Sequence, residues 1–407
     1  MNRRPARGMT LIEMMVALAI GLILSLAIFA IMAVFEGRRR TVVASSELDQ
    51  SAGVAMFQID RWARSAGTGF GSAASYGYGC ELFATDSDGS RILPMQAALP
   101  APFAAVNPGA KGIFRLAPLL ILPGQTSPGA SNAVKDGHLS DVLVLMSSGN
   151  GGSQVATAFT AAATTTGLTV ANTLAFSGGD LVLLADRQLA ATGGIAPCMV
   201  TQADSTVTSG LFTAMPLGGA RYAASIDSAS VSNYSMTGVA FNIGNLASAQ
   251  PPSFQLLGVG DNNTLYSYDL LHTSDTALQA RAEGVFELHA LYGIGSSSDR
   301  TVDTWVSPSD GKYTVEALSA GTPAAAALLA TIRAVRIGLI MRTSLPERSG
   351  SAAGAASGAA TTATSLTLFS DLADPALVYT RALAAAEQQY RYRTLEATIP
   401  LRNNAFQ

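Results

Sequence analysis

Glu13 has the clearest chemical meaning of any side chain in this sequence, because it stands at the start of an uncharged, apolar run over residues 14–35. That run would span about 33 Å as an α-helix, which matches a bilayer hydrocarbon core of roughly 30 Å. An ionised carboxylate inside a bilayer costs on the order of 2.5–3.5 kcal/mol. We therefore expect Glu13 to have a partner that offsets its charge.

The other residues that could do chemistry form no convergent pattern. The histidines lack metal-ligand spacing, and His289 lies in a strand-like pattern that favours a structural role. Residues 86–90 (DSDGS) resemble the start of a calcium loop, but the later acidic ligand of an EF-hand is missing, so a solvated turn is favoured. The sequence contains no nucleophile elbow or Walker-type phosphate loop. We predict no catalytic residue, no cofactor, no metal site and no enzymatic activity.

Two scattered pairs of acids are the remaining candidates for acid–base catalysis, Glu283 with Glu287 and Glu387 with Glu396. No other reactive group converges on them in the sequence. Because exposed carboxylates are the common case, we expect these four on the surface.

One long helix is expected to position Glu13. Three arginines (Arg3, Arg4 and Arg7) precede the apolar run, and a second apolar pattern with helical spacing follows it. Glycines at positions 67, 69 and 71 end that pattern. We predict a helix over residues 9–66, membrane-spanning over 9–35 and amphipathic over 36–66. The predicted buried stripe contains Leu48, Ala52, Ala55, Ile59, Trp62 or Ala63, and Ala66.

The motif GMTLIE at residues 8–13 resembles the prepilin leader of type IV pilins and of the pseudopilins of type II secretion, although the family usually has Phe in place of Met9. The resemblance implies that prepilin peptidase removes residues 1–8 by cutting between Gly8 and Met9, and then methylates the amino group of Met9. It also implies that Glu13 pairs with the terminal amine of a neighbouring subunit in the assembled fibre. The same assembly segment contains Thr10, Leu11 and Ile12.

Two other interpretations of the N-terminus fit less well. A secretory signal peptide has a shorter apolar core, about 7–15 residues, ending in an A-x-A-like site, and residues 31–33 (IMA) do not supply that site. An uncleaved membrane anchor fits the length but leaves Glu13 and the Gly8 junction unexplained. The family resemblance places the leader in the cytoplasm and the head, residues 67–407, in the periplasm.

Cys80 and Cys198 are the two cysteines of the 407-residue chain. In an exported head they would lie in an oxidising compartment, so one disulfide is favoured over two buried free thiols. The formal net charge of −3, with 13% charged residues, suggests no basic face for a nucleic-acid partner.

Strand-like runs and turn signals beyond residue 140 predict an α+β protein, with the long helix packed on a head of mainly antiparallel strands. Residues 71–128 are expected to be irregular, and the low-complexity residues 349–365 to form a mobile loop. Strands are expected over residues 141–147, 180–185, 198–201, 231–243, 254–259, 264–270, 285–292, 335–342 and 393–401, and further helices over 323–332 and 375–389.

Residues 284–293 (GVFELHALYG), 334–343 (AVRIGLIMRT) and 390–403 (YRYRTLEATIPLRN) resemble the C-terminal signature of PilW-type minor pilins. This resemblance implies a structural subunit of a bacterial type IV pilus that joins other minor pilins in a tip complex and primes pilus growth. The implied partners are prepilin peptidase, other minor pilins, the major pilin, the inner-membrane assembly platform and, before assembly, inner-membrane lipid. The alternatives are a type II secretion pseudopilin and an uncleaved, membrane-tethered periplasmic enzyme; an adhesive role at the tip is compatible with the pilin interpretation.

Overall fold

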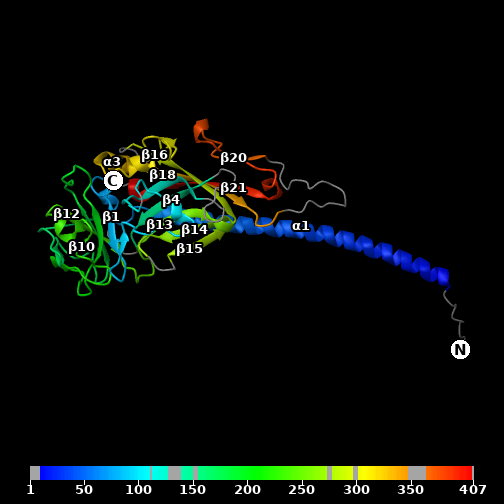
Figure 1. Ribbon diagram of the computed structural model, residues 1–407, viewed down its shortest axis with the longest axis horizontal. Helices are drawn as coiled ribbons and strands as arrows, with labels where there is room; N and C mark the ends of the chain where they lie inside the picture. The colour runs from blue at the N-terminus through cyan, green and yellow to red at the C-terminus, as the bar shows by residue number, and fades with distance from the viewer. Residues whose placement is uncertain are drawn as a thin grey trace, which may run out of the picture.

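The computed structural model describes residues 10–110, 112–126, 139–149, 155–272, 277–296, 301–346 and 364–405. Its longest element, α1 (Leu11–Ser65), leaves the head as a gently curved rod (Figure 1). The helix ends just before Gly67, whose φ of 79° lies in the left-handed region that favours glycine. The predicted long helix is therefore confirmed.

The first sheet of the head has six strands in the order β2-β1-β8-β7-β12-β5. Within the described residues, the pair β1–β8 is parallel and the other pairs of this sheet are antiparallel. The strands are β1 (Leu82–Thr85), β2 (Arg91–Leu93), β5 (Thr157–Ala158), β7 (Leu181–Asp186), β8 (Cys198–Gln202) and β12 (Gly238–Gly244).

The second sheet has five antiparallel strands in the order β15-β14-β13-β4-β3. The strands predicted over residues 254–259 and 264–270 are confirmed and form a hairpin, since β13 and β14 pair from Gly260↔Thr264 onward. Its turn, η5 (Asp261–Asn263), places Asn262 at a φ of 61°. The strands are β3 (Leu119–Thr126), β4 (Ser140–Ser147), β13 (Ser253–Gly260), β14 (Thr264–Asp269) and β15 (Leu278–Glu283).

The third sheet has four antiparallel strands in the order β17-β16-β18-β21. These are β16 (Val285–Ile294), β17 (Thr304–Val306), β18 (Ile332–Arg342) and β21 (Tyr392–Pro400). The described residues also form three two-stranded ribbons: β6 (Gly167–Thr169) with β9 (Ala214–Pro216), β10 (Ser225–Ile226) with β11 (Ala229–Ser230), and β19 (Ser365–Leu368) with β20 (Tyr379–Ala382). The short helices are α2 (Val315–Leu318), α3 (Pro323–Thr331) and α4 (Arg402–Ala405), with 3-10 turns η1 (Gly71–Ala73), η2 (Phe103–Ala105), η4 (Val231–Asn233), η6 (Pro375–Leu377) and η7 (Glu387–Gln389).

The main hydrophobic core lies where the second half of α1 meets the sheets. The buried face of the helix carries the predicted stripe, with Ala63 rather than Trp62 fully buried: Leu48, Ala52, Ala55, Ile59, Ala63 and Ala66. A second cluster packs against the first sheet, around Phe83, Phe176 and Met199. A third, smaller one joins the β19–β20 ribbon to the third sheet through Phe286 and Phe369. The expected α+β class is confirmed.

Three predictions about local structure are wrong. The helix predicted over residues 375–389 is instead η6, β20 and η7, because Tyr379 and its neighbours pair with β19 and pack against the third core. Asp374 caps the start of this segment, since its Oδ1 accepts from Ala376 N at 2.9 Å, but only a 3-10 turn follows.

The predicted irregular region over residues 71–128 contains β1, β2 and β3, whose runs are short and interrupted by turn residues. The strand predicted over residues 231–243 begins only at Gly238, since Val231–Asn233 form η4. The low-complexity loop over residues 349–365 lies outside the described residues up to position 363, and β19 begins at Ser365.

Candidate functional site

Glu13 lies in the first turn of α1 and is folded back onto the start of its own helix. Thr10 is the N-cap: its Oγ1 accepts from Glu13 N at 3.4 Å, and its backbone N–H donates to Glu13 Oε2 at 3.5 Å. This capping box satisfies two of the amide groups that a helix start leaves without partners. The carboxylate of Glu13 thus lies beside the residue that follows Met9. The T-x-x-E spacing of Thr10 and Glu13 is the sequence signal of a capping box, and we did not recognise it from the sequence.

The first half of α1 carries apolar side chains on all its sides. Within it, Leu11–Met32 is long and apolar enough to cross a membrane, and none of that span is buried against the head. Leu11, for example, is 79% exposed. Apolar surface on this scale is unfavourable in water and marks a contact with lipid or with other apolar helices.

The end of α1 is held by Asn403, at the far end of the chain. Asn403 Nδ2 donates to Ala66 O at 3.1 Å and to Thr68 Oγ1 at 2.7 Å, with longer contacts of 3.4 Å to Arg64 O and Ser65 O. One amide group therefore serves the carbonyls that the end of a helix leaves without partners. No local sequence signal pointed to this contact.

Two further polar contacts fix the middle of α1 to the head. Ser51 Oγ donates to Glu283 O in β15, and Arg393 of β21 forms an ion pair with Asp49. Together with the buried stripe, these contacts make the second half of α1 part of the head, while the first half stays free of it (Figure 1).

Cys80 and Cys198 form the expected disulfide, with their Cα atoms 5.6 Å apart, so the alternative of two free thiols is wrong. Both residues are fully buried. Cys198 begins β8, and Cys80 lies two residues before β1, whose Leu82 pairs with Cys198 in parallel register. The bridge thus closes the junction between two neighbouring strands that are far apart in sequence.

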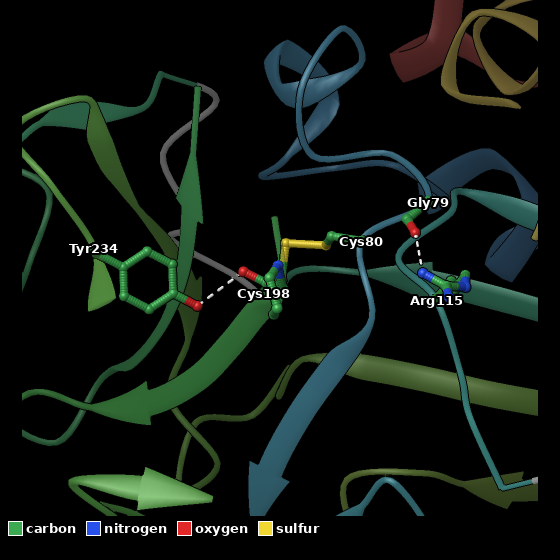
Figure 2. Close-up of a disulfide and its surroundings, with 6 residues drawn as sticks. Gly79, Cys80, Arg115, Cys198 and Tyr234 are labelled. Carbon is green, nitrogen blue, oxygen red and sulfur yellow. Dashed lines mark hydrogen bonds between the residues drawn. A yellow bond between two sulfur atoms is a disulfide. The ribbon is translucent and has the colours of Figure 1, made fainter. Parts of the chain in front are cut away.

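The surroundings of the disulfide are tied to the head by hydrogen bonds (Figure 2). Arg115 Nη1 donates to Gly79 O at 2.9 Å, and the Tyr234 hydroxyl donates to Pro197 O at 3.0 Å. Burial raises the pKa of Tyr234, so its hydroxyl stays protonated and remains a donor. Gly79 precedes Cys80 and Pro197 precedes Cys198, so the backbone next to each cysteine is fixed by a side chain that is distant in sequence.

A buried ionic cluster ties the β19–β20 ribbon to the third sheet. Arg381, only 1% exposed, places Nε 2.7 Å from Glu287 Oε1 and Nη2 2.7 Å from Glu387 Oε1. The Tyr379 hydroxyl donates to Glu287 Oε2 at 2.8 Å, and its ring stacks on His289 with a centroid distance of 3.7 Å. These contacts make the cluster a structural clamp rather than an open reaction site.

The prediction that the four acids lie on the surface is wrong for Glu287 and Glu387, which are 2% and 4% exposed. Successive side chains of β16 point to opposite faces, so Glu287 and His289 share one face. Their atoms Glu287 Oε2 and His289 Nε2 are 3.3 Å apart. Arg381, the partner of Glu287 and Glu387, lies in the segment that we mistook for a helix, so the sequence did not reveal the cluster.

The remaining candidates are not brought together into a site. His272 pairs with Asp269 at 2.9 Å, and His138 lies outside the described residues. Residues 86–90 form the turn between β1 and β2, where Asp86 pairs with Arg221 at 2.7 Å. Across the described ranges, no group of three or more His, Cys, Asp or Glu residues is placed to hold a metal ion.

Comparison with known families finds one match near each end of the chain. Residues 3–29 match the prokaryotic N-terminal methylation motif, and residues 256–403 match the type IV pilus-assembly protein W. The first match covers Glu13 and most of the exposed half of α1; the second runs from β13 to Asn403. No curated protein and no solved structure matches the chain.

Proposed function

We propose that this chain, a type IV pilin-like protein of the PilW type, is a minor pilin that is cut between Gly8 and Met9 and helps to prime pilus assembly in a tip complex. The methylation motif supports processing of the N-terminus by prepilin peptidase, and the PilW match supports a role in the pilus rather than in type II secretion. The same matches favour a structural subunit over an uncleaved, membrane-tethered enzyme.

The observation that carries the proposal is the division of α1 into two halves. The span Leu11–Met32 has no burial against the head, whereas the stripe from Leu48 to Ala66 is built into its core. A helix of this kind holds its head outside a membrane and leaves its first half available for lipid, and later for other helices of the same kind. Residues 9–35 would form the fibre core, and the head would face outward.

The capping box explains how cleavage prepares assembly. Removing residues 1–8 leaves a positively charged amine on Met9, directly before the Thr10 N–H that Glu13 already contacts. In a neighbouring subunit the same amine is a partner for Glu13. At about 4 Å and an effective dielectric constant of about 20, such a pair is worth roughly 4 kcal/mol, several times its strength in water.

The proposed processing also implies where the chain resides and which partners it meets. The precursor would reside in the inner membrane with its head in the periplasm, and prepilin peptidase would release it for assembly. Other minor pilins, the major pilin and the inner-membrane assembly platform would then receive it. The mature chain would end on the pilus at the cell surface.

Substitutions at Glu13 separate the ion pair from the helix cap. Glu13→Gln keeps a capping-box side chain of the same size but removes the charge, whereas Glu13→Ala removes both. We expect both variants to be processed normally and to lower piliation by about tenfold or more, since a loss of about 1.4 kcal/mol suffices for that. The measurement is surface pili per cell, with leader loss followed by mass spectrometry.

The control is Thr10→Ser, which retains a hydroxyl cap and should form pili normally. Normal piliation by Glu13→Gln together with a loss by Glu13→Ala would show that Glu13 acts as a cap, and the pairing mechanism would be wrong. Deletion of the whole chain tests the alternative. A deletion strain that forms normal pili but fails to secrete the substrates of type II secretion would identify the protein as a pseudopilin.

A further inference from the structure

β21 is the last strand of the third sheet, so only one of its two edges pairs with β18. Hydrogen bonds just beyond the two ends of the strand show which residues face β18. Leu401 N donates to Arg333 O at 2.8 Å, and Thr343 N donates to Arg391 O at 3.0 Å. Because hydrogen-bonded and non-hydrogen-bonded pairs alternate in an antiparallel ladder, the odd-numbered residues of β21 bond to β18 and the even-numbered residues face away from it.

The even-numbered residues form an open row of backbone groups. Among the described residues, the backbone N–H and C=O groups of Thr394, Glu396 and Thr398 have no hydrogen-bond partner, and all three residues are exposed. Pro400 also occupies an outward-facing position, where a residue without an N–H removes nothing from the ladder with β18. An unpaired row of this kind is a template for one further strand.

β21 differs in this respect from the other edge strands of the three large sheets. β2, β5 and β17 have only two or three residues each. β3 and β15 are longer, but the register of each shifts along its pairing with the neighbouring strand. Short and irregular edge strands are two ways in which proteins prevent strand addition. β21 pairs with β18 over nine consecutive residues without a shift, so its outer edge lacks both protections.

Charged side chains also discourage strand addition, but those of β21 are engaged within the chain. Glu396 Oε2 lies 2.7 Å from Arg336 Nη2, and Arg393 forms an ion pair with Asp49. Neither side chain therefore leaves an unpaired charge beside the open row.

The position of β21 indicates which molecule reaches this edge. The strand lies beside the half of α1 that belongs to the head (Figure 1): Arg393 pairs with Asp49 near one end, and Asn403, just beyond the other end, donates to Ala66 O at 3.1 Å. The same helix continues into the span Leu11–Met32, which has no burial against the head. In the proposed fibre, helices of other subunits cover that span, so neighbouring subunits lie alongside α1 and β21.

We infer that the outer edge of β21 binds an extended strand of a neighbouring pilus subunit. A linear row of alternating donors and acceptors matches an extended backbone, which supplies the complementary row. Cross-strand neighbours set the side chains of the partner: apolar residues beside the half-buried Leu395 and Ala397, and polar residues beside the exposed Thr394 and Thr398. The inference rests on the proposed function, because it takes the partner to be another subunit of the same fibre.

Photo-crosslinking in the piliated native host tests the inference, with p-benzoylphenylalanine placed at position 394 or 398 of the full chain. This side chain leaves the outward N–H of either residue in place. We expect both positions to crosslink to one other subunit, which has its own prepilin leader. The two crosslinks should fall in one extended segment of that subunit, about four residues apart, because paired strands advance together.

Thr398→Pro, in the chain with the photo-reactive residue at position 394, removes one outward N–H and leaves the bonds to β18 intact. The crosslink yield should fall about tenfold, because a carbonyl of the partner strand loses its donor. Thr398→Val is the matched control, since it keeps the N–H and suits a strand, and its yield should equal that of the unsubstituted chain. Urea unfolding of both variants checks that the head is folded.

Three results would overturn the inference: no crosslink from either position, crosslinks only within the same chain or to a protein without a prepilin leader, or an unchanged yield in a folded Thr398→Pro variant. The crosslinks from positions 394 and 398 decide the question even if Thr398→Pro fails to fold. Loss of pili on deletion of the chain, together with absent crosslinks, would refute strand addition alone. Normal pili after deletion would instead refute the proposed function.

Discussion

Removing the disulfide should cost the head a large part of its stability. The bridge spans a sequence separation of 118 residues, and both cysteines are fully buried. In the chain-entropy model a loop of this length contributes about 5 kcal/mol at 25 °C. Domains of this kind have unfolding free energies of roughly 5–15 kcal/mol, so the loss amounts to a third of the stability or more. We choose Cys80→Ala with Cys198→Ala, because alanine leaves no buried hydroxyl without a partner.

Urea unfolding of the wild type and the double variant measures this loss. We expect a much lower midpoint for the variant together with a steeper slope, because an unfolded chain without the cross-link exposes more surface. Wild-type protein unfolded and refolded under reductant is the control: it keeps both sulfurs but opens the loop, and should lose nearly as much stability as the variant. A variant within about 1 kcal/mol of the oxidised wild type would refute the reasoning, since β1 and β8 would then be held by their own pairing alone.

Two further predictions concern side chains that hold the ends of the fold together. Arg381→Met should lower the unfolding free energy by about 3–5 kcal/mol, because Glu287 and Glu387 would remain as buried charges without their cation; a loss below about 1 kcal/mol by urea unfolding would contradict this. Asn403→Asp should destabilise the head more than Asn403→Ala, since a carboxylate beside the carbonyl of Ala66 meets both the lone pairs and the negative end of the helix dipole. Melting temperatures in the reverse order would show that Asn403 does not act as a donor to α1.

Local sequence patterns were enough to predict two parts of the fold, the buried stripe of α1 and the β13–β14 hairpin. The stripe from Leu48 to Ala66 was readable because spacings of three and four leave little choice of buried face. The hairpin around Asn262 was readable because its turn residues separate two strand-like runs. Both signals lie within one short stretch of sequence, so they can be recognised without knowing which surface the stretch packs against.

The features that escaped prediction depend on partners distant in sequence. Residues 375–389 contain alanines and glutamines that favour a helix, but the pairing of β20 with β19 decides the conformation of Tyr379. The burial of Glu287 depends on Arg381, and the capping of α1 depends on Asn403. The cap of Glu13 by Thr10 is different, since its four-residue signal was present and was overlooked.

The mass of the mature chain tests the central claim most directly. Protein purified from a host with active prepilin peptidase should begin at an N-methylated Met9, and the same gene expressed without the peptidase should retain residues 1–8. A native protein that still begins at Met1 would contradict the account, because the amine that Glu13 is proposed to meet would never be formed.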